Sequence, residues 1–158
     1  KSDVEYTRDK TVQYIKAKNP YEFQDMVAAL LRAMGYYTPF VAPKGRDGGV
    51  DVIAYIDALG AKTPRIKVQV KHMPETSIPA KDIRSLLGIL RDGDIALFVT
   101  SGTYSPQART EALTSKTYIK LIDGEEFIEM WQEYYSKMND EDKNMMPLKH
   151  IAFVGSNE

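Results

Sequence analysis

One apolar stretch constrains the fold of this chain more than any other. Residues 94–100 read Asp-Ile-Ala-Leu-Phe-Val-Thr, an apolar run with no alternation of apolar and polar side chains. Such a run is typical of a central strand that is covered on both faces of its sheet. The stretch therefore predicts a layered α/β fold, with a central mixed β-sheet flanked by helices on both faces.

Helical and strand patterns surround this central strand in a regular order. The runs 50–56 and 65–71 are expected to pair as antiparallel strands joined by a long loop. Helices end or begin at typical signals, such as Gly35 after the first apolar stripe and Ser105-Pro106 before a later one. Helices are predicted over 19–34, 78–92, 105–113 and 123–135, and strands over 36–41, 50–56, 65–71, 94–100 and 118–122.

The length of 158 residues, 43% of them apolar, is enough for one ordinary globular core. Residues 1–18 are expected to form an N-terminal extension, either an additional helix or a linker. The main domain is predicted over 19–138. A C-terminal tail is predicted over 139–158, in which residues 151–154 either add a strand or form an unstructured end.

The composition excludes several classes of protein. The chain has no cysteine, so a disulfide framework, a thiolate zinc site and a cysteine nucleophile are all excluded. No stretch approaches the roughly 18 consecutive apolar residues of a membrane span, and no membrane partner is expected. We expect a cytoplasmic protein.

The charge is unevenly distributed although the net charge is only −1. Residues 41–91 contain nine Lys or Arg and five Asp or Glu, whereas residues 123–142 contain eight acids and one lysine. Because local charge decides whether a phosphate backbone can approach, a nucleic-acid partner is compatible with this chain.

Asp51 and the segment Gln69-Val70-Lys71 form the strongest candidate site. In a strand, residues i and i+2 point to the same face, so Gln69 and Lys71 project together. If the two runs pair as neighbours, Asp51 joins them, and an acid, an amide and an ammonium converge. Asp51, the Gln69 amide oxygen and the Val70 backbone carbonyl are suitable ligands for Mg²⁺, and Lys71 is suited to orient or deprotonate a water.

Residues beside this site are candidates for contact with DNA phosphates. Gly48 and Gly49 allow the backbone to bend sharply and to approach a substrate closely. Lys44, Arg46 and His72 are predicted to meet flanking phosphates, which position a nucleic acid without reading its sequence. Ser101 is a weaker candidate of the same kind, next to a helix N-terminus.

The same residues carry a resemblance to a known family. Gly45-Arg46-Asp47-Gly48-Gly49-Val50-Asp51, followed by Val68-Gln69-Val70-Lys71, resembles the catalytic domain of the Mrr-type restriction endonucleases, a variant of the PD-(D/E)XK nucleases in which glutamine replaces the middle acid. The likeness extends over about residues 20–132. It implies a restriction-endonuclease-like fold and Mg²⁺-dependent (or Mn²⁺-dependent) cleavage of DNA in a restriction system, with Asp51, Gln69 and Lys71 as catalytic residues.

The chain departs from the family pattern at the leading helix. Family members often carry an acid directly after the helix phenylalanine, where this chain has Gln24. Glu22 is therefore the candidate for a second carboxylate on the metal. The chain shows no N-terminal winged-helix region, and because it begins at Lys1 an upstream DNA-recognition domain outside it is one expectation. Cutting both strands of a duplex suggests a homodimer or a larger homo-oligomer.

Two other functions stay open. A nuclease of the same fold that acts in DNA repair or in junction processing would use the same site, because fold and site chemistry do not fix the substrate. A non-catalytic DNA-binding module of a larger protein would retain the fold, but replacement of Asp51 or Lys71 is expected there, and neither is replaced.

Overall fold

A computed structural model describes residues 3–44 and 49–148 of the chain, and its centre is a five-stranded sheet. The strands lie in the order β1-β2-β3-β5-β7. The first three pair in antiparallel fashion, and β3, β5 and β7 run parallel, so the predicted mixed sheet is confirmed. The strands are β1 (Tyr37–Val41), β2 (Val52–Tyr55), β3 (Arg65–Lys71), β5 (Asp94–Thr100) and β7 (Ile119–Ile122).

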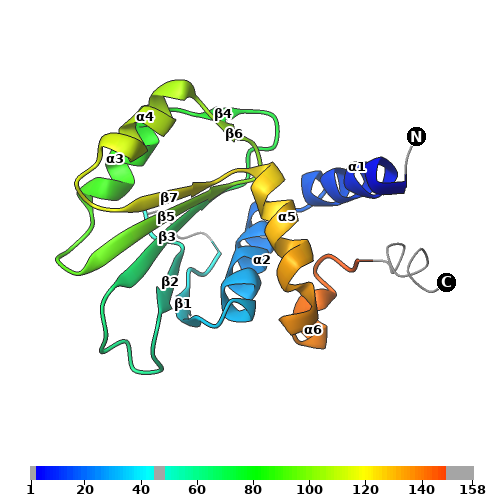
Figure 1. Ribbon diagram of the computed structural model, residues 1–158, viewed down its shortest axis with the longest axis horizontal. Helices are drawn as coiled ribbons and strands as arrows, with labels where there is room; N and C mark the ends of the chain where they lie inside the picture. The colour runs from blue at the N-terminus through cyan, green and yellow to red at the C-terminus, as the bar shows by residue number, and fades with distance from the viewer. Residues whose placement is uncertain (1–2, 45–48, 149–158) are drawn as a thin grey trace.

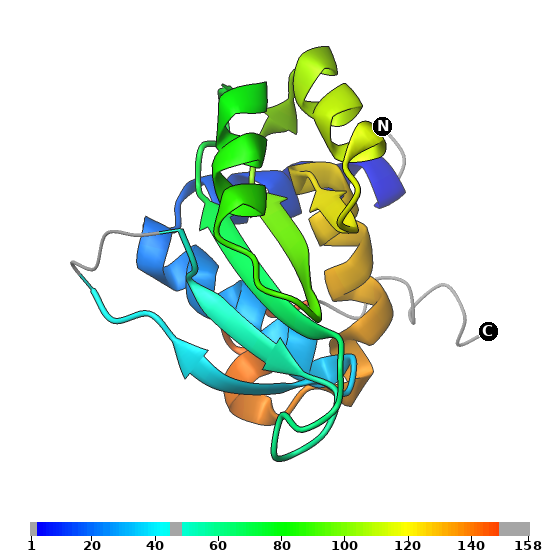
Figure 2. The ribbon, with the colours of Figure 1, turned by 90° about the vertical axis from the view of Figure 1, so that its left-hand side faces the viewer.

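Helices cover both faces of this sheet, as the central strand required. The helices α2 (Pro20–Ala33) and α5 (Gly124–Tyr134) lie on one face, and α3 (Ala80–Gly88) and α4 (Pro106–Thr114) lie on the other (Figure 1). Figure 2 looks toward the second face, where α3 and α4 lie over the β5 and β7 side, while β1 and β2 lie away from them.

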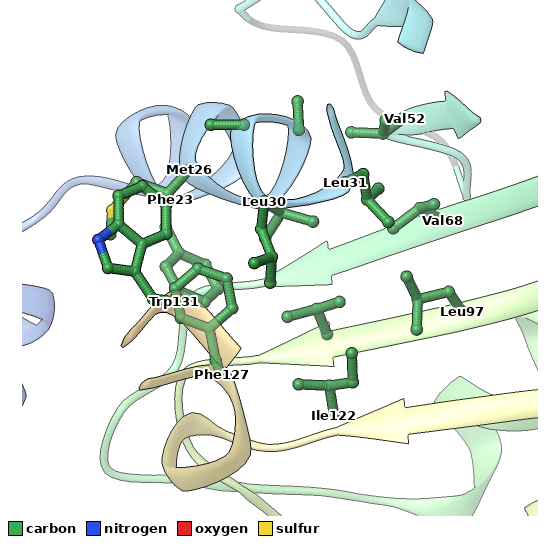
Figure 3. Packing of buried hydrophobic residues seen from close by; sticks show 14 of the residues in the cluster. Phe23, Met26, Leu30, Leu31, Val52, Val68, Leu97, Ile122, Phe127 and Trp131 are labelled. Carbon is green, nitrogen blue, oxygen red and sulfur yellow. The ribbon is translucent and has the colours of Figure 1, made fainter. Parts of the chain in front are cut away.

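Each face of the sheet has its own hydrophobic core. The larger cluster lies under α2 and α5, where Phe23, Phe127 and Trp131 pack ring against ring, and Leu30 and Leu31 continue the cluster toward Val68 (Figure 3). The smaller cluster joins α3 and α4 to β5 and β7. Its buried members are Ile78, Ile83, Leu86, Ala96, Phe98, Tyr104, Ala108 and Ile119.

The helices α2, α4 and α5 begin where the local sequence signals predicted, whereas α3 is shorter than the predicted range 78–92 and has no side-chain cap. Asn19 and Glu22 form a reciprocal capping box at the start of α2. Ser105 caps α4 by accepting a hydrogen bond from the Ala108 N–H, and Asp123 caps α5 in the same way. After α2, Gly35 adopts a φ of +101°, a conformation that favours glycine.

Packing extends beyond the predicted main domain at both ends. Residues 3–16 form a helix, α1 (Asp3–Lys16), and its Ile15 is buried in the larger core. At the other end, the Trp131 Nε1–H donates to the Met146 carbonyl at 3.0 Å, and Asp142 pairs with Arg32. Residues 139–148 thus pack on the core rather than trailing from it, and the division into domains itself stays a prediction. The predicted strand at 151–154 lies outside the described residues.

Four short elements were absent from the sequence prediction. A second, two-stranded parallel sheet consists of β4 (Ser77–Ile78) and β6 (Thr103–Tyr104). A 3₁₀ turn, η1 (Tyr135–Lys137), and the helix α6 (Asp140–Lys143) follow α5. Elements this short carry no periodic signal in sequence. In the part of the chain that the structure describes, no helix is both long and apolar enough to cross a bilayer.

Candidate active site

The antiparallel pairing of β2 with β3 brings Asp51 beside Gln69 and Lys71. Val52 pairs with Val68 and Ile53 with Lys67, so Asp51 stands opposite Gln69. Val52 and Val68 are fully buried in the larger core. Because side chains alternate along a strand, Asp51, Gln69 and Lys71 all project from the opposite face, the one that carries α3.

Hydrogen bonds fix Asp51 on three sides. Its N–H donates to the Val68 carbonyl at 2.8 Å, and its carbonyl accepts from the Ala42 N–H at 2.7 Å. Its Oδ2 accepts from the Val70 N–H at 2.7 Å. Because the N–H and C=O of one strand residue point to the same side, the Val70 carbonyl also lies on the side of the Asp51 carboxylate.

Gln69 carries a buried acceptor that the fold does not use. Its Oε1 is inaccessible to solvent and has no hydrogen-bond partner among the described residues. A buried unsatisfied acceptor costs about 1–3 kcal/mol and calls for an explanation such as a bound ion. With the Asp51 carboxylate on the same strand face and the Val70 carbonyl, this amide oxygen would complete a set of hard oxygen donors, which suits Mg²⁺ or Mn²⁺.

Lys71 lies two residues further along the same face and meets an acid from α3. Its Nζ is 3.6 Å from Oδ2 of Asp82, in the first turn of that helix. Nothing in the sequence marks Asp82 as a site residue, because a first-turn acid is expected from the helix dipole alone. In the described part of the chain, no group of three or more His, Asp or Glu side chains could hold a metal ion.

Gln24 supports Asp51 from behind rather than facing a metal. This side chain is 8% exposed, and its Nε2 donates to the Ala42 carbonyl at 2.8 Å. Ala42 in turn donates its N–H to the Asp51 carbonyl. An ionised glutamate has no N–H to donate, so the amide at this position suits the structure that surrounds it.

Glu22, the candidate for a second carboxylate on the metal, caps the start of α2. Its Oε1 accepts from the Asn19 N–H at 2.8 Å in the capping box. This role accounts for a glutamate at position 22, and its binding to a metal stays a prediction.

His72 and Ser101 bind each other within the fold. The Nε2–H of His72 donates to the Lys18 carbonyl at 2.6 Å, so Nδ1 is the acceptor for the Ser101 hydroxyl at 2.8 Å. The imidazole also stacks on Phe23, and burial lowers the pKa of His72. These internal contacts compete with the predicted phosphate contacts of both residues, because the polar atoms concerned already have partners.

Of the two basic residues in the glycine-rich segment, Lys44 lies within the described residues and Arg46 does not. Lys44 is exposed, with its Nζ 5.7 Å from the centre of the Tyr21 ring. Arg46 lies outside the described residues, as does Gly48. The predicted contacts of Lys44 and Arg46 with phosphate stay predictions.

The mixed sheet with helices on both faces is shared with known restriction endonucleases. The fold resembles MspJI restriction endonuclease, solved in complex with a 27-mer oligonucleotide, with a TM-score of 0.59 and 23% identity over 87% of this chain and 32% of that one. It also resembles the DNA modification-dependent restriction endonuclease AspBHI, with a TM-score of 0.67 and 14% identity over 100% of this chain and 43% of that one. A protein of unknown function matches with a TM-score of 0.55 and 22% identity over 75% of this chain and 67% of that one.

The fold is therefore restriction-endonuclease-like, as the sequence resemblance implied. Residues 15–131 match the restriction endonuclease family Mrr_cat. The chain belongs to this family. It spans about a third of MspJI and less than half of AspBHI. No curated protein sequence matches it.

Proposed function

We propose that this chain is a divalent-metal-dependent DNA endonuclease that acts in a restriction system. The observation that carries the proposal is the buried Oε1 of Gln69, which has no partner within residues 3–44 and 49–148 and lies on the strand face of Asp51 and Lys71. Membership of a restriction endonuclease family supports the reaction class. The oligonucleotide named with MspJI and the modification dependence named with AspBHI support DNA as the substrate.

Each residue of the site has a distinct part in the proposed reaction. Asp51, Gln69 and the Val70 carbonyl would hold the cation, with Mg²⁺ as first choice and Mn²⁺ as second. A divalent cation supplies Lewis-acid stabilisation of charge on the phosphate and makes a nucleophilic water more acidic. The Val70 N–H orients the Asp51 carboxylate through its 2.7 Å bond. Lys71 orients the attacking water and offsets negative charge that develops on the phosphate.

The unsatisfied amide oxygen distinguishes this proposal from a non-catalytic DNA-binding module. A module without chemistry gains nothing from a buried acceptor that lacks a partner, and it has no need to keep Asp51 and Lys71 on one face. Repair and restriction are not separated by the site, and the family membership favours restriction.

A cleavage assay tests the proposal. Wild type, Asp51→Ala, Gln69→Ala and Lys71→Ala are incubated with unmodified and cytosine-modified plasmid DNA in Mg²⁺ or Mn²⁺. We expect wild type to cut at least one substrate, and loss of Asp51 or Lys71 to lower the rate by about 10³-fold or more. Equal cleavage by wild type and both of these variants would contradict the assignment.

Binding to phosphate is tested separately. Lys44→Ala and Arg46→Ala are expected to weaken binding to all DNA sequences alike and to lower the slope of affinity against salt by about one per residue. Titration in fluorescence anisotropy at several salt concentrations measures this slope. A loss of affinity confined to one sequence would contradict a role in backbone contact.

A further inference from the structure

Lys71 and Asp82 form an ion pair across the candidate site, from two elements that are each fixed by packing. The Lys71 Nζ lies 3.6 Å from Asp82 Oδ2, and the two side chains are 36% and 20% exposed. The Lys71 carbonyl accepts from the Ser101 N–H, which fixes the end of β3. The neighbour of Asp82, Ile83, is fully buried, which fixes the first turn of α3.

We propose that Asp82 is the positioning residue for Lys71 in the reaction proposed above, on which this inference rests. A lysine stem is long, flexible and rich in rotamers, so an ammonium needs a fixed partner to stay in one place. Asp82 supplies that partner from the same face of the sheet. The carboxylate keeps the ammonium on the face of Asp51 and Gln69, where it meets the phosphate and the water without a search through its rotamers.

The chain contains a second ion pair of the same design away from the site. Lys120 on β7 lies 3.0 Å from Glu126 in the first turn of α5, with side-chain exposures of 45% and 37%. Both pairs join a strand lysine to a first-turn acid, and both acids also favour their helix through its dipole. Only the Lys71–Asp82 pair includes a residue of the site. Glu126→Gln is therefore a matched control for Asp82→Asn.

The kinetic test compares Asp82→Asn, Asp82→Glu and Glu126→Gln with wild type. Asp82→Asn keeps the size of the side chain and removes its charge. We expect it to lower kcat on the order of tenfold while KM for DNA does not rise, because Lys71 is misplaced and not lost. Asp82→Glu is expected to restore most of kcat, and Glu126→Gln to behave as wild type. A wild-type kcat in Asp82→Asn, or an equal loss in Glu126→Gln, would overturn the inference.

A second measurement does not depend on cleavage. A double-mutant cycle of Lys71→Met and Asp82→Asn in urea unfolding measures whether the two side chains interact in solution. We expect the double variant to be more stable than the sum of the two single changes predicts. Additive changes would show that the pair does not form and would overturn the inference, whatever the activity.

The two measurements separate this inference from the proposed function. If wild type cuts no DNA with either metal while the cycle shows coupling, the endonuclease proposal fails and the ion pair stands. If cleavage requires Asp51 and Lys71 but not Asp82, the function stands and the positioning role is wrong.

Discussion

Strands β3 and β5 are neighbours of equal length, in parallel register from Arg65 opposite Asp94 to Lys71 opposite Thr100, yet they differ in cover. On the face of α3 and α4, the β5 side chains Ala96, Phe98 and Thr100 are almost fully buried. On the same face of β3, the side chains of Lys67, Gln69 and Lys71 are only partly buried. The same face of the sheet thus forms a core at β5 and the candidate site at β3.

The position of the helices explains this difference. The smaller core joins α3 and α4 to β5 and β7 and, among the described residues, includes none of β3. The face of β3 is therefore left for polar side chains, while its other face is closed by Val68 in the larger core. Four experiments test this contrast between a strand that stabilises the fold and a strand that carries the candidate site.

The largest effect is expected from β5. Phe98→Ala removes a fully buried ring that lies edge-on to Tyr104 at 5.9 Å. Its loss should reduce the free energy of unfolding by about 3–5 kcal/mol, because a large cavity is left between helix and sheet. Urea denaturation measures the change. Gln69→Ala changes a side chain of β3 that is only partly buried, so it should lower the free energy of unfolding far less. An equal loss of stability in the two variants would remove the contrast between the strands.

The second-largest loss of stability is expected from the ion pair that joins β3 to the start of β5. Lys67 Nζ lies 2.6 Å from Asp94 Oδ2, which also accepts from the Arg91 N–H, and the Asp94 side chain is only 3% exposed. Asp94→Asn should reduce the free energy of unfolding by roughly 2 kcal/mol, less than for a fully buried pair because Lys67 reaches some solvent. The exposed pair of Arg84 with Glu111 is the control, and Glu111→Gln should change stability by less than about 1 kcal/mol.

A smaller change in the free energy of unfolding is expected for two glutamines, and its direction should differ between Gln69 in the candidate site and Gln24 in the supporting structure. Gln69→Leu removes an unsatisfied buried oxygen and should leave the free energy of unfolding unchanged or raise it by about 1 kcal/mol, while cleavage is lost. Gln24→Leu removes the donor to the Ala42 carbonyl and should lower stability by about 1–2 kcal/mol. A clear loss of stability in Gln69→Leu would show that its amide belongs to the scaffold.

The smallest effect on stability is expected from His72, which directly follows β3. Burial lowers the pKa of His72, which binds Lys18 and Ser101 in its neutral form. The unfolded chain therefore takes up a proton more readily, so stability should fall as the pH drops below about 6.5 and is fully present above it. Urea denaturation at pH 7.5 and pH 5.5 measures the difference. In His72→Phe, this part of the pH dependence should disappear; an unchanged slope would assign it to other groups.

Several features of the fold could be predicted because their causes are local. The apolar run 94–100 predicted a strand covered on both faces, and β5 has the same bounds. Capping signals at Asn19, Ser105 and Asp123 predicted helix starts to within a residue. The short strands β4 and β6 were missed, since two residues cannot display a period and are fixed by contact with each other.

The candidate site could be predicted only in part. The alternation along 65–71 placed Gln69 and Lys71 on one face, and the hairpin added Asp51. The hydrogen bonds around these residues could not be predicted, because they join positions far apart in sequence. Gln24 binds Ala42 over 18 residues, and His72 binds Ser101 over 29. Nor does any sequence period specify which first-turn acid meets which strand lysine.

The sequence by itself determined that this is a layered α/β chain of the restriction endonuclease family with an acid, an amide and a lysine on one face. Periodicity, caps and a short motif are sufficient for that, because each acts within a few residues. Only the tertiary structure decided that the Gln69 oxygen is buried with no partner in the described part of the chain, and that Asp82 lies beside Lys71. Burial and ion pairing depend on how a helix lies across a sheet, and that arrangement follows from the packing of the whole core.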